Sequence, residues 1–378
     1  MDDHDEREAA IPGAPLARAL AFYLPQFHPI PENDSWWGKG FTEWTNVAEA
    51  RPLFRGHAQP EIPADLGFYD LRLPETRAAQ AALAERHGVE AFCYWHYWFA
   101  GSRLLQRPFD EVLASGEPRL PFCLAWANED WTALWSGDPG RILIKQTYPG
   151  RADFERHFYE VLPAFFDARY VRVDGKPLFF IYRPKQLPSA QSFADQWRTL
   201  ASDNGLPGLY LVGERKGGWH ASADGFDAET YPPLWDVPRR QVLPGRIGAR
   251  LDRVVRRGPR TSPYRSVATR PRTPSTLPHP ELPTVMPNWD NTPRLGRRGL
   301  VLTDSTPELF EAAARRAVEA VQALPREQRI VFVKSWNEWA EGNYMEPDRR
   351  FGDQYLCALR RAVSAPVHRS RVSANETG

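Results

Sequence analysis

The chain has 378 residues, which is enough for one large α/β barrel or for two ordinary domains with a substantial core. Its formal net charge of +1, with 25% charged residues, predicts a soluble protein without an overall attraction to nucleic acid or membrane. Three cysteines make neither a disulfide framework nor a zinc motif, so we expect no metal and no other cofactor.

The N-terminal part of the sequence does not have the composition of a secretory signal. Residues 1–18 are acidic and polar and lack the basic and apolar regions of a secretory signal, and no apolar stretch approaches the about 18 residues of a spanning helix. We therefore expect a cytoplasmic protein without a transmembrane segment. One domain at 19–364 is predicted between flexible tails at 1–18 and 365–378.

Eight short apolar runs, rich in aromatic and β-branched residues, predict strands. They lie at 19–24, 89–94, 121–125, 177–182, 209–213, 226–231, 284–286 and 330–333. Helical patterns lie between several of them, at 74–87, 151–169, 189–203 and 307–324, and a closing helix is predicted at 353–364. Pro163 should kink or restart the second helix. This alternation predicts a (β/α)8 TIM barrel with long loops.

The segment 236–283, between the sixth and seventh runs, is rich in Arg and Pro and has few acidic residues. It fits a solvated insertion with one short helix near 247–257. It also fits a basic lid or docking arm that contacts an anionic glycan, a phosphorylated sugar or lipid headgroups.

The last apolar run leads into two glutamates, Glu338 and Glu341, placed among Trp336, Trp339 and Gly342. A pair of carboxylates can share acid and base work at a glycosidic bond, and indole rings pack against sugar rings. The same Glu-x-x-Glu spacing occurs by chance in solvated helices. Because charge is costly after a buried strand unless it has a function, the position favours catalysis.

Polar and aromatic residues follow the other runs too, as expected where strands of a TIM barrel end. The candidates for substrate binding are Tyr23, Gln26, His28, Glu43, Trp44, Trp95, His96, Trp126, Asn128, Glu129, Tyr182, Tyr231, Trp289, Trp336, Asn337 and Trp339. Each has a structural alternative. A lone histidine is more often structural, Asn128 and Glu129 also fit a capped loop, and some of the aromatic residues must belong to the core.

Four motifs in this order resemble the WbsX-like proteins, which group with the glycoside hydrolase family 99-like domains. They are FYLPQFHP at 22–29, NDSWWGKGFTEW at 33–44, WANE at 126–129 and WNEWAEGN at 336–343. The resemblance spans residues 19–359. It implies a TIM barrel that acts on an oligo- or polysaccharide, often in the assembly of bacterial surface polysaccharides.

The resemblance also implies a division of labour between the two glutamates. As in family 99 endo-α-mannosidases, Glu338 would take the proton of the sugar 2-hydroxyl, whose oxygen then attacks the anomeric carbon to form a 1,2-anhydro sugar. Glu341 would protonate the leaving oxygen and later activate water or an alcohol. Ala340 stands where those mannosidases carry His, which leaves hydrolysis and transfer both open.

Three functions remain open at this point. The first is retaining endo-glycosidase or transglycosylase action on a mannose-type or bacterial surface polysaccharide. The second is a glycosyltransferase of O-antigen or capsule synthesis, although no Rossmann-type glycine fingerprint and no convincing metal-binding Asp-x-Asp motif would hold a sugar nucleotide. The third is a non-catalytic glycan-binding barrel, which fold alone does not exclude.

Overall fold

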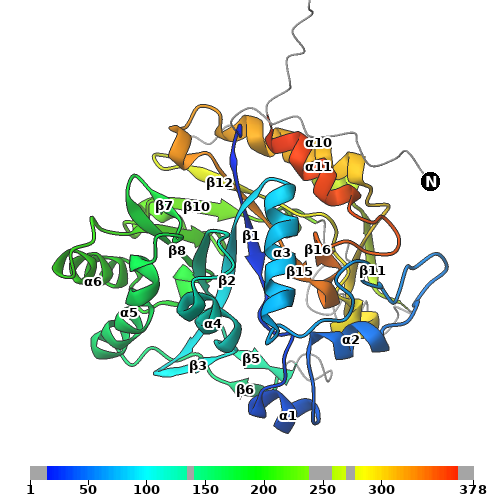
Figure 1. Cartoon of the computed structure of the whole chain (residues 1–378), viewed down its shortest axis with the longest axis horizontal. Coiled ribbons are helices and arrows are strands. Elements are labelled where there is room, and N and C mark those ends of the chain that lie inside the picture. Colours follow the sequence, from blue (N-terminus) through cyan, green and yellow to red (C-terminus); the bar gives the residue numbers. More distant parts are fainter. Residues whose placement is uncertain (1–14, 134–139, 238–257, 270–276, 365–378) are drawn as a thin grey trace, which may run out of the picture.

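Eight parallel strands close into a barrel in the computed structural model, which describes residues 15–133, 140–237, 258–269 and 277–364 (Figure 1). In order around the barrel they are β1 (Arg18–Tyr23), β2 (Val89–Phe99), β4 (Phe122–Trp126), β8 (Lys176–Ile181), β9 (Tyr210–Glu214), β10 (Ala228–Tyr231), β12 (Glu281–Val285) and β14 (Ile330–Val333). β14 closes on β1 in parallel register, from Arg18 opposite Ile330 to Ala21 opposite Val333. The predicted TIM barrel is confirmed, and each of the eight apolar runs overlaps one of its strands.

The start of the barrel differs from the prediction. β1 begins at Arg18, and the backbone N–H of Leu16 donates to the carbonyl oxygen of Val363 at 2.8 Å. The tail prediction is therefore wrong for residues 16–18, because backbone pairing and burial of Ala17 hold them in the fold. Residues 1–14 and 365–378 lie outside the described part of the chain.

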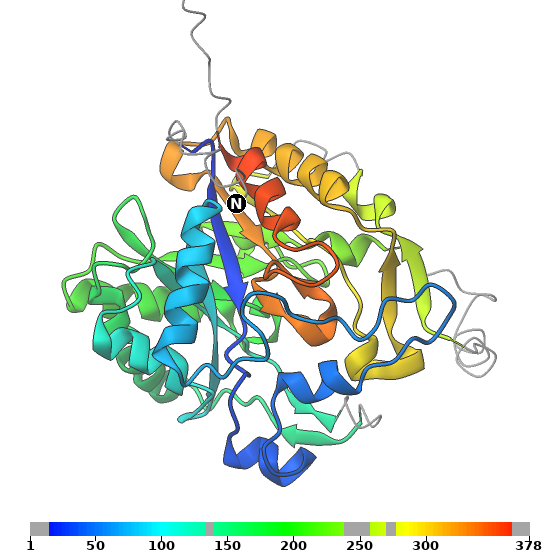
Figure 2. The ribbon, with the colours of Figure 1, turned by 45° about the vertical axis from the view of Figure 1, so that its right-hand side comes forward.

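Long helices surround the barrel in the positions that the sequence predicts (Figures 1 and 2). They are α3 (Pro74–Arg86), α5 (Arg151–Phe166), α6 (Ala190–Asp203), α10 (Pro307–Val321) and α11 (Gln354–Val363), and the sequence did not predict α4 (Arg107–Ser115). Ser189 and Thr306 cap α6 and α10 through their side-chain oxygens. α5 continues through Pro163 as one helix instead of restarting there.

Shorter elements build the loops around the barrel. The strands are β3 (Ser102–Leu104), β5 (Trp131–Thr132), β6 (Ile142–Ile144), β7 (Arg172–Val173), β11 (Arg260–Pro263), β13 (Leu300–Thr303), β15 (Asn337–Glu338) and β16 (Asn343–Tyr344). The short α-helices are α1 (Pro31–Trp37), α2 (Glu43–Glu49), α8 (Arg265–Ala268) and α9 (Thr292–Leu295). Single 3-10 turns are η2 (Pro184–Gln186), η3 (Ala221–Ala223), η4 (Pro233–Asp236), η5 (Gly296–Arg298), η6 (Arg326–Gln328) and η7 (Trp339–Glu341).

Part of the Arg- and Pro-rich segment packs against the barrel. β11 pairs in parallel with β13, and the buried Tyr264 donates its hydroxyl hydrogen to the carbonyl oxygen of Met286 at 2.6 Å. Tyr264, Val267 and Met286 belong to one small hydrophobic cluster with Trp289. A solvated insertion is therefore wrong for residues 260–268, which bury apolar surface beside the seventh strand of the barrel. The short helix expected at 247–257 lies outside the described residues.

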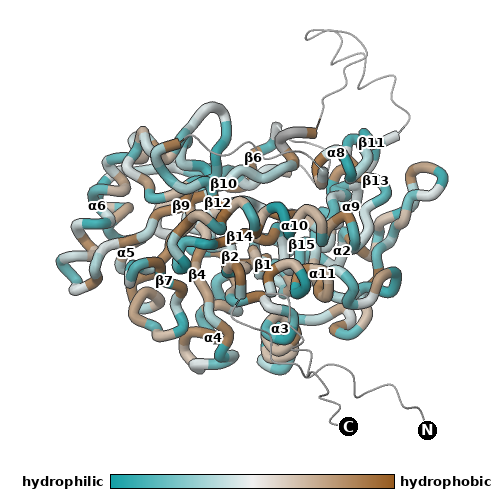
Figure 3. Tube along the Cα trace, turned by 90° about the horizontal axis from the view of Figure 1, so that it is seen from above, coloured by the Kyte–Doolittle hydropathy of each residue, from teal (hydrophilic) through white to brown (hydrophobic). Residues whose placement is uncertain are grey.

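Aromatic rings fill the inside of the barrel. The ring of Phe22 lies 4.7 Å from Trp95, 5.0 Å from Phe180 and 5.3 Å from Phe332, measured between centroids. Figure 3 shows that hydrophobic and hydrophilic residues alternate along the surrounding helices. Within the described ranges, no helix is long and apolar enough to cross a membrane. The packed interior leaves the C-terminal ends of the strands as the place for a site.

Candidate active site

The chain after β14 turns sharply and returns, forming a small hairpin of β15, η7 and β16. Asn337 fixes this hairpin to the end of β1, because its side chain accepts from the backbone N–H of Leu24 at 2.7 Å and donates to the Leu24 carbonyl at 3.0 Å. Gly342 closes the turn with a φ of +57°, where a Cβ would lie 2.8 Å from the backbone nitrogen of Asp290. The hairpin thus carries Glu338 and Glu341 in one fixed orientation.

A pocket opens above the C-terminal ends of the strands. It is lined by Leu24, Gln26, Asn33, Trp37, Trp95, Tyr97, Ala127, Glu129, Asp130, Trp131, Thr132, Leu143, Tyr182, Trp289, Arg294, Lys334, Glu338 and Glu341. Both predicted catalytic glutamates line it, together with aromatic rings. This combination suits a sugar, whose ring packs on aromatic faces while its hydroxyl groups need polar partners.

Glu338 is buried and held from two sides. Its Oε1 accepts a hydrogen bond from the indole nitrogen of Trp95 at 3.0 Å, and its backbone N–H donates to the hydroxyl of Ser335 at 3.1 Å. Burial raises the pKa of this carboxyl, but the positive charge of Lys334 and a hydrogen bond from Glu341 outweigh burial and lower the pKa below its usual value. Glu338 is therefore ionised in this pocket.

Glu341 has the opposite tendency. Burial and the negative charge of Glu338 raise its pKa to about 8. Arg294 opposes the shift with a 2.6 Å contact to Oε1 of Glu341, but the same guanidinium also binds Glu43 at 2.5 Å, so its charge is divided between two carboxyls. Glu341 therefore holds a proton at neutral pH.

Lys334 supplies the positive charge next to Glu338. It follows β14, is 8% exposed, and its ammonium lies 5.8 Å from the ring centroid of Trp95 and 5.5 Å from that of Tyr182. Burial lowers its pKa, yet Tyr182 and the surrounding carboxyls raise it above the usual lysine value. The ammonium therefore stays charged and is placed to keep Glu338 ionised.

Seven of the residues predicted from the sequence line the pocket together. They are Gln26, Trp95, Glu129, Tyr182, Trp289, Glu338 and Glu341. The two glutamates and Trp95 meet at its floor, while Glu129 also pairs with Arg183 at 3.2 Å. These seven residues therefore share one pocket, and their catalytic and substrate-binding roles stay predictions.

The other eleven predicted residues do not line this pocket. They are Tyr23, His28, Glu43, Trp44, His96, Trp126, Asn128, Tyr231, Trp336, Asn337 and Trp339. The geometry therefore does not indicate that they contact a substrate directly, and most of them are buried.

Several of these eleven residues support the pocket walls. Glu43 binds Arg294 and accepts from the backbone N–H of Ala340 at 3.2 Å, and Asn337 anchors the hairpin. The indole nitrogen of Trp339 donates to Glu346 at 2.6 Å, while its ring stacks on Tyr344 at 3.7 Å. These contacts fix the position of the hairpin that carries Glu338 and Glu341.

Others belong to the packed interior of the protein. The ring nitrogens of His96 and His157 lie 2.8 Å apart, and Trp126 packs against the same His157. Asn128 bonds through its side-chain amide to the backbone of Arg183.

The remaining five have their own local partners. The buried ring of Trp336 lies 4.9 Å from that of Phe92, measured between centroids. His28 contacts the Pro25 carbonyl at 3.0 Å, the Tyr23 hydroxyl donates to Gln80 at 2.7 Å, and the indole of Trp44 donates to the carbonyl of Tyr69. The guanidinium of Arg215 lies 4.5 Å from the ring of Tyr231. The structural alternatives given for the lone histidines and for Asn128 are thus the ones that the geometry favours.

The sequence missed several polar residues of the site. Arg294 lies on α9, outside the four motifs, and Lys334 lies two residues before the last motif. Asn33 is almost fully buried, yet both polar atoms of its side chain lack a hydrogen-bond partner among the described residues, as do Nε2 of Gln26 and Nε1 of Trp289. Since all three line the pocket, they are candidates for binding sugar hydroxyls.

One group of three side chains in the described part of the chain could hold a metal ion. These residues, His87, Asp353 and Cys357, lie outside the pocket.

Sequence comparison places the chain beside one described family and two curated relatives. The family described as Glycosyltransferase WbsX matches residues 19–359. The relatives, both called "Uncharacterized protein WxcX", come from two strains of Xanthomonas campestris pv. campestris and are 41% and 40% identical over 370 residues. The match covers 95% of this chain but 51% of each relative, so the chain spans about half of their length.

Comparison with solved structures supports the fold. A glycoside hydrolase-like protein superimposes with a TM-score of 0.60 at 16% identity, over 92% of this chain and 94% of the other. The GH99 endo-alpha-mannosidase from Bacteroides thetaiotaomicron superimposes with a TM-score of 0.54 at 15% identity, over 91% and 95%. At such identities the likeness shows a shared barrel fold.

Proposed function

The chain belongs to the WbsX glycosyltransferase family, and we propose that it is a retaining glycan-active enzyme in which Glu338 is the base and Glu341 is the acid. Family and fold support a carbohydrate-active enzyme in the coarser sense. The main support for the roles of the two glutamates is that they are hydrogen-bonded to each other and that their pKa values are shifted in opposite directions. The pKa of Glu338 is lowered and that of Glu341 is raised.

The first step would open the glycosidic bond without a covalent link to the protein. The ionised Glu338 removes the proton of the sugar 2-hydroxyl, and that oxygen forms a bond to the anomeric carbon. The bond from the anomeric carbon to the leaving oxygen breaks, and Glu341 gives this oxygen its proton. The product is a 1,2-anhydro sugar, with Glu338 protonated and Glu341 ionised.

The second step would reverse these roles. Glu341 removes a proton from water or from an alcohol of an acceptor sugar, and the acceptor oxygen attacks the anomeric carbon. The bond between that carbon and the 2-oxygen breaks, and the 2-oxygen regains a proton from Glu338. Two inversions give net retention, and both carboxyls return to their starting states.

The pocket walls would orient the sugar for this chemistry. The Trp95 and Tyr182 rings offer apolar faces, and Gln26, Asn33 and Trp289 offer polar atoms that lack protein partners among the described residues. A mannose-type sugar in a bacterial surface polysaccharide is the substrate class that we propose. The choice of sugar follows from the structural neighbour that is an endo-alpha-mannosidase.

The test is product analysis with glutamate variants. Wild-type protein is incubated with mannose-containing polysaccharides, and the anomeric configuration of the new end is followed by NMR. We expect a retained configuration. Replacing Glu338 or Glu341 by Gln should lower kcat by about 100-fold to 10,000-fold, because each variant removes one proton-transfer group.

The matched control is Glu308→Gln, which changes an exposed glutamate on α10. It should keep full activity, and all variants should melt like the wild type. Full turnover in either active-site variant, or an inverted product, would refute the assignment. Normal glycan binding without any turnover in the wild type would indicate the non-catalytic barrel instead.

Transfer to a sugar acceptor is the second candidate, and membership of a glycosyltransferase family favours it. The same two glutamates need only an alcohol in place of water. Adding candidate acceptor oligosaccharides should then raise the yield of a longer glycan at the cost of the hydrolysis product. Tight binding or hydrolysis of a sugar nucleotide by the purified protein would point to an activated donor instead.

We also propose that the basic segment 236–283 contacts an anionic glycan or lipid headgroup at the membrane surface. Its arginines Arg239, Arg240, Arg256, Arg257, Arg270 and Arg272 carry this proposal, and they lie outside the described residues. Neutralising all six should weaken action on anionic glycans more than on neutral ones. An equal effect on both would exclude a role in charge recognition.

A further inference from the structure

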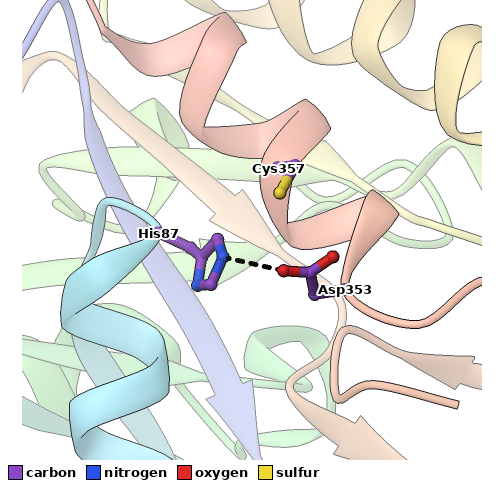
Figure 4. A group of neighbouring side chains, drawn as sticks. All are labelled: His87, Asp353 and Cys357. Atoms are coloured by element: carbon purple, nitrogen blue, oxygen red, sulfur yellow. Dashed lines mark ion pairs between the residues drawn. The ribbon is translucent and has the colours of Figure 1, made fainter. Parts of the chain in front are cut away.

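Three potential metal ligands meet on the outside of the barrel, between α3 and α11 (Figure 4). His87 follows the last residue of α3, Asp353 precedes α11, and Cys357 lies one turn further along that helix. One ligand atom from each residue lies within 4.8 Å of the other two. Because Gly88 and then β2 follow His87, the cluster is near the N-terminal end of β2, away from the pocket.

His87 has the orientation of a metal ligand. Its Nδ1 lies 2.9 Å from the carbonyl oxygen of Leu83, which can only accept, so Nδ1 carries the proton and Nε2 of the neutral ring carries a lone pair. Metal-bound histidines usually donate their other ring N–H to a carboxylate, a backbone carbonyl or water, and the Leu83 carbonyl takes that position here. Nε2 therefore faces the other two residues as a donor of electrons.

Asp353 is placed opposite this lone pair. Its Oδ2 lies 3.6 Å from Nε2 of His87, beyond a normal hydrogen bond, and its side chain makes no capping bond to α11. A carboxylate and a lone pair repel each other unless the ring takes a second proton or a cation lies between them. The arrangement thus has room and charge for a positive ion.

Solvent can reach the cluster, and its members can adjust. The Asp353 side chain is 52% exposed and Cys357 is partly exposed and not in a disulfide, while the His87 side chain is only 5% exposed. Zinc takes nitrogen at about 2.0–2.1 Å and sulfur at about 2.3 Å in a tetrahedral site. A small rotation of Asp353 would bring its oxygen to this range around a fixed histidine.

We propose that His87, Asp353 and Cys357 bind one zinc ion, with water as the fourth ligand. Imidazole and thiolate select zinc over magnesium or calcium, which prefer oxygen ligands only. The Cys357 thiol loses its proton to solvent when the ion binds. The sequence shows no zinc motif here because His87 is far from Asp353 along the chain.

The ion would connect the first long helix of the barrel to the last one. α3 joins β1 to β2, and α11 follows β14, which closes the sheet on β1. A link between residues so far apart removes conformational freedom mainly from the unfolded chain. The role that follows is stabilisation of the closed barrel, without a part in the chemistry of the pocket.

The experiment uses the full chain after treatment with a chelator. Cobalt(II) is titrated as a spectroscopic probe, and we expect one equivalent to produce a thiolate-to-cobalt absorption band that zinc displaces. Saturating zinc should raise the melting temperature of the wild type. Cys357→Ser should lose the band, and Asp353→Asn, which keeps a residue suited to a helix N-terminus, should weaken zinc binding at least about tenfold.

Cys93→Ala is the matched control, since Cys93 is fully buried in the barrel wall. It should keep both the band and the stabilisation by zinc. Failure of the wild type to bind cobalt, or a Cys357→Ser variant that binds as tightly as the wild type, would overturn the proposal. Because the cluster is remote from the pocket, none of these outcomes depends on the proposed enzymatic activity.

Discussion

Lys334 and Glu338 form a charged pair at the floor of the pocket. Burial raises the pKa of Glu338, and Lys334 is the strongest of the groups that lower it. Replacing Lys334 by Met removes that charge at similar length, so the pKa of Glu338 should rise. Since the proposed base works only when ionised, the acidic limb of the kcat/KM profile against pH should move to higher pH.

The control for this change is Lys176→Met, at the start of β8 and the opposite end of the barrel. That variant should leave the profile in place. An acidic limb that does not move in Lys334→Met would show that another group sets the charge of the base. A rise in KM with an unchanged kcat and no shift of the limb would assign Lys334 to substrate binding instead.

The protonation of Glu341 should set the basic limb of the same kcat/KM profile. Its pKa is raised to about 8 by burial and by the charge of Glu338, so the acid form is present below that pH and is lost above it. We expect kcat/KM to fall as pH rises through about 8, although the two carboxyls titrate as a pair. A glycosyl fluoride, whose leaving group needs no proton, should not show this basic limb in its first step.

If the glycosyl fluoride and the glycan substrate showed the same fall in kcat/KM at high pH, the deprotonation of Glu341 would not be its cause.

The two glutamates were predictable from the sequence because a buried strand leads directly to them. Arg294 was not, because its contacts with Glu341 and Glu43 join residues 47 and 251 positions away in the chain. Lys334 stands beside the last motif in the sequence, but its effect on the pKa of Glu338 depends on the folded positions of the surrounding carboxyls.

At the scale of elements, the hairpin that carries Glu338 and Glu341 depends on a close approach between Gly342 and Asp290. The Asp290 backbone N–H donates to the carbonyl oxygen of Glu341 at 2.6 Å, and Gly342 has a φ of +57°. An alanine there would place its Cβ 2.8 Å from the backbone nitrogen and from the Cβ of Asp290. We expect Gly342→Ala to lower stability by about 2–3 kcal/mol and to reduce turnover sharply.

Gly67→Ala is the matched control, because Gly67 has a φ of +61° but no neighbouring atom within 4 Å of an added Cβ. It should show only the backbone cost, about 1–2 kcal/mol, with turnover retained. Denaturant unfolding and kcat of both variants make the comparison. Equal losses in the two would mean that the approach to Asp290 does not position the hairpin.

The elements that the sequence predicted are the ones with their own periodic pattern. Eight apolar runs and five helices were visible because their residues determine the pattern locally. The pairings of β11 with β13 and of β15 with β16 were not, because strands of two to four residues form through contacts with distant partners. The Arg-rich composition of 236–283 likewise concealed Tyr264, whose burial depends on Met286.

At the scale of the whole molecule, the closure of the barrel brings the two ends of the described chain together. The N–H of Leu16 donates to Val363, and its carbonyl accepts from the side chain of Gln322 at 3.0 Å. Arg18 binds Glu90 at 2.6 Å and, through its backbone, pairs with Arg329 at 2.7 Å. The order of the predicted strands indicated the barrel. It did not indicate that residues before Arg18 make hydrogen bonds that help to close it.

Two truncated chains test how much the contacts of residues 15–18 contribute to the stability of the barrel. A chain of residues 15–364 keeps these contacts and should melt like the full chain. A chain of residues 19–364, cut at the boundary predicted from the sequence, loses several hydrogen bonds of about 1 kcal/mol each and the buried Ala17. Its melting temperature, measured by calorimetry, should be lower by about 5 °C or more. Identical melting of both truncated chains would show that β14 holds β1 without help from residues 15–18. A lower melting temperature of the longer chain than of the full chain would show that residues outside 15–364 also contribute to stability.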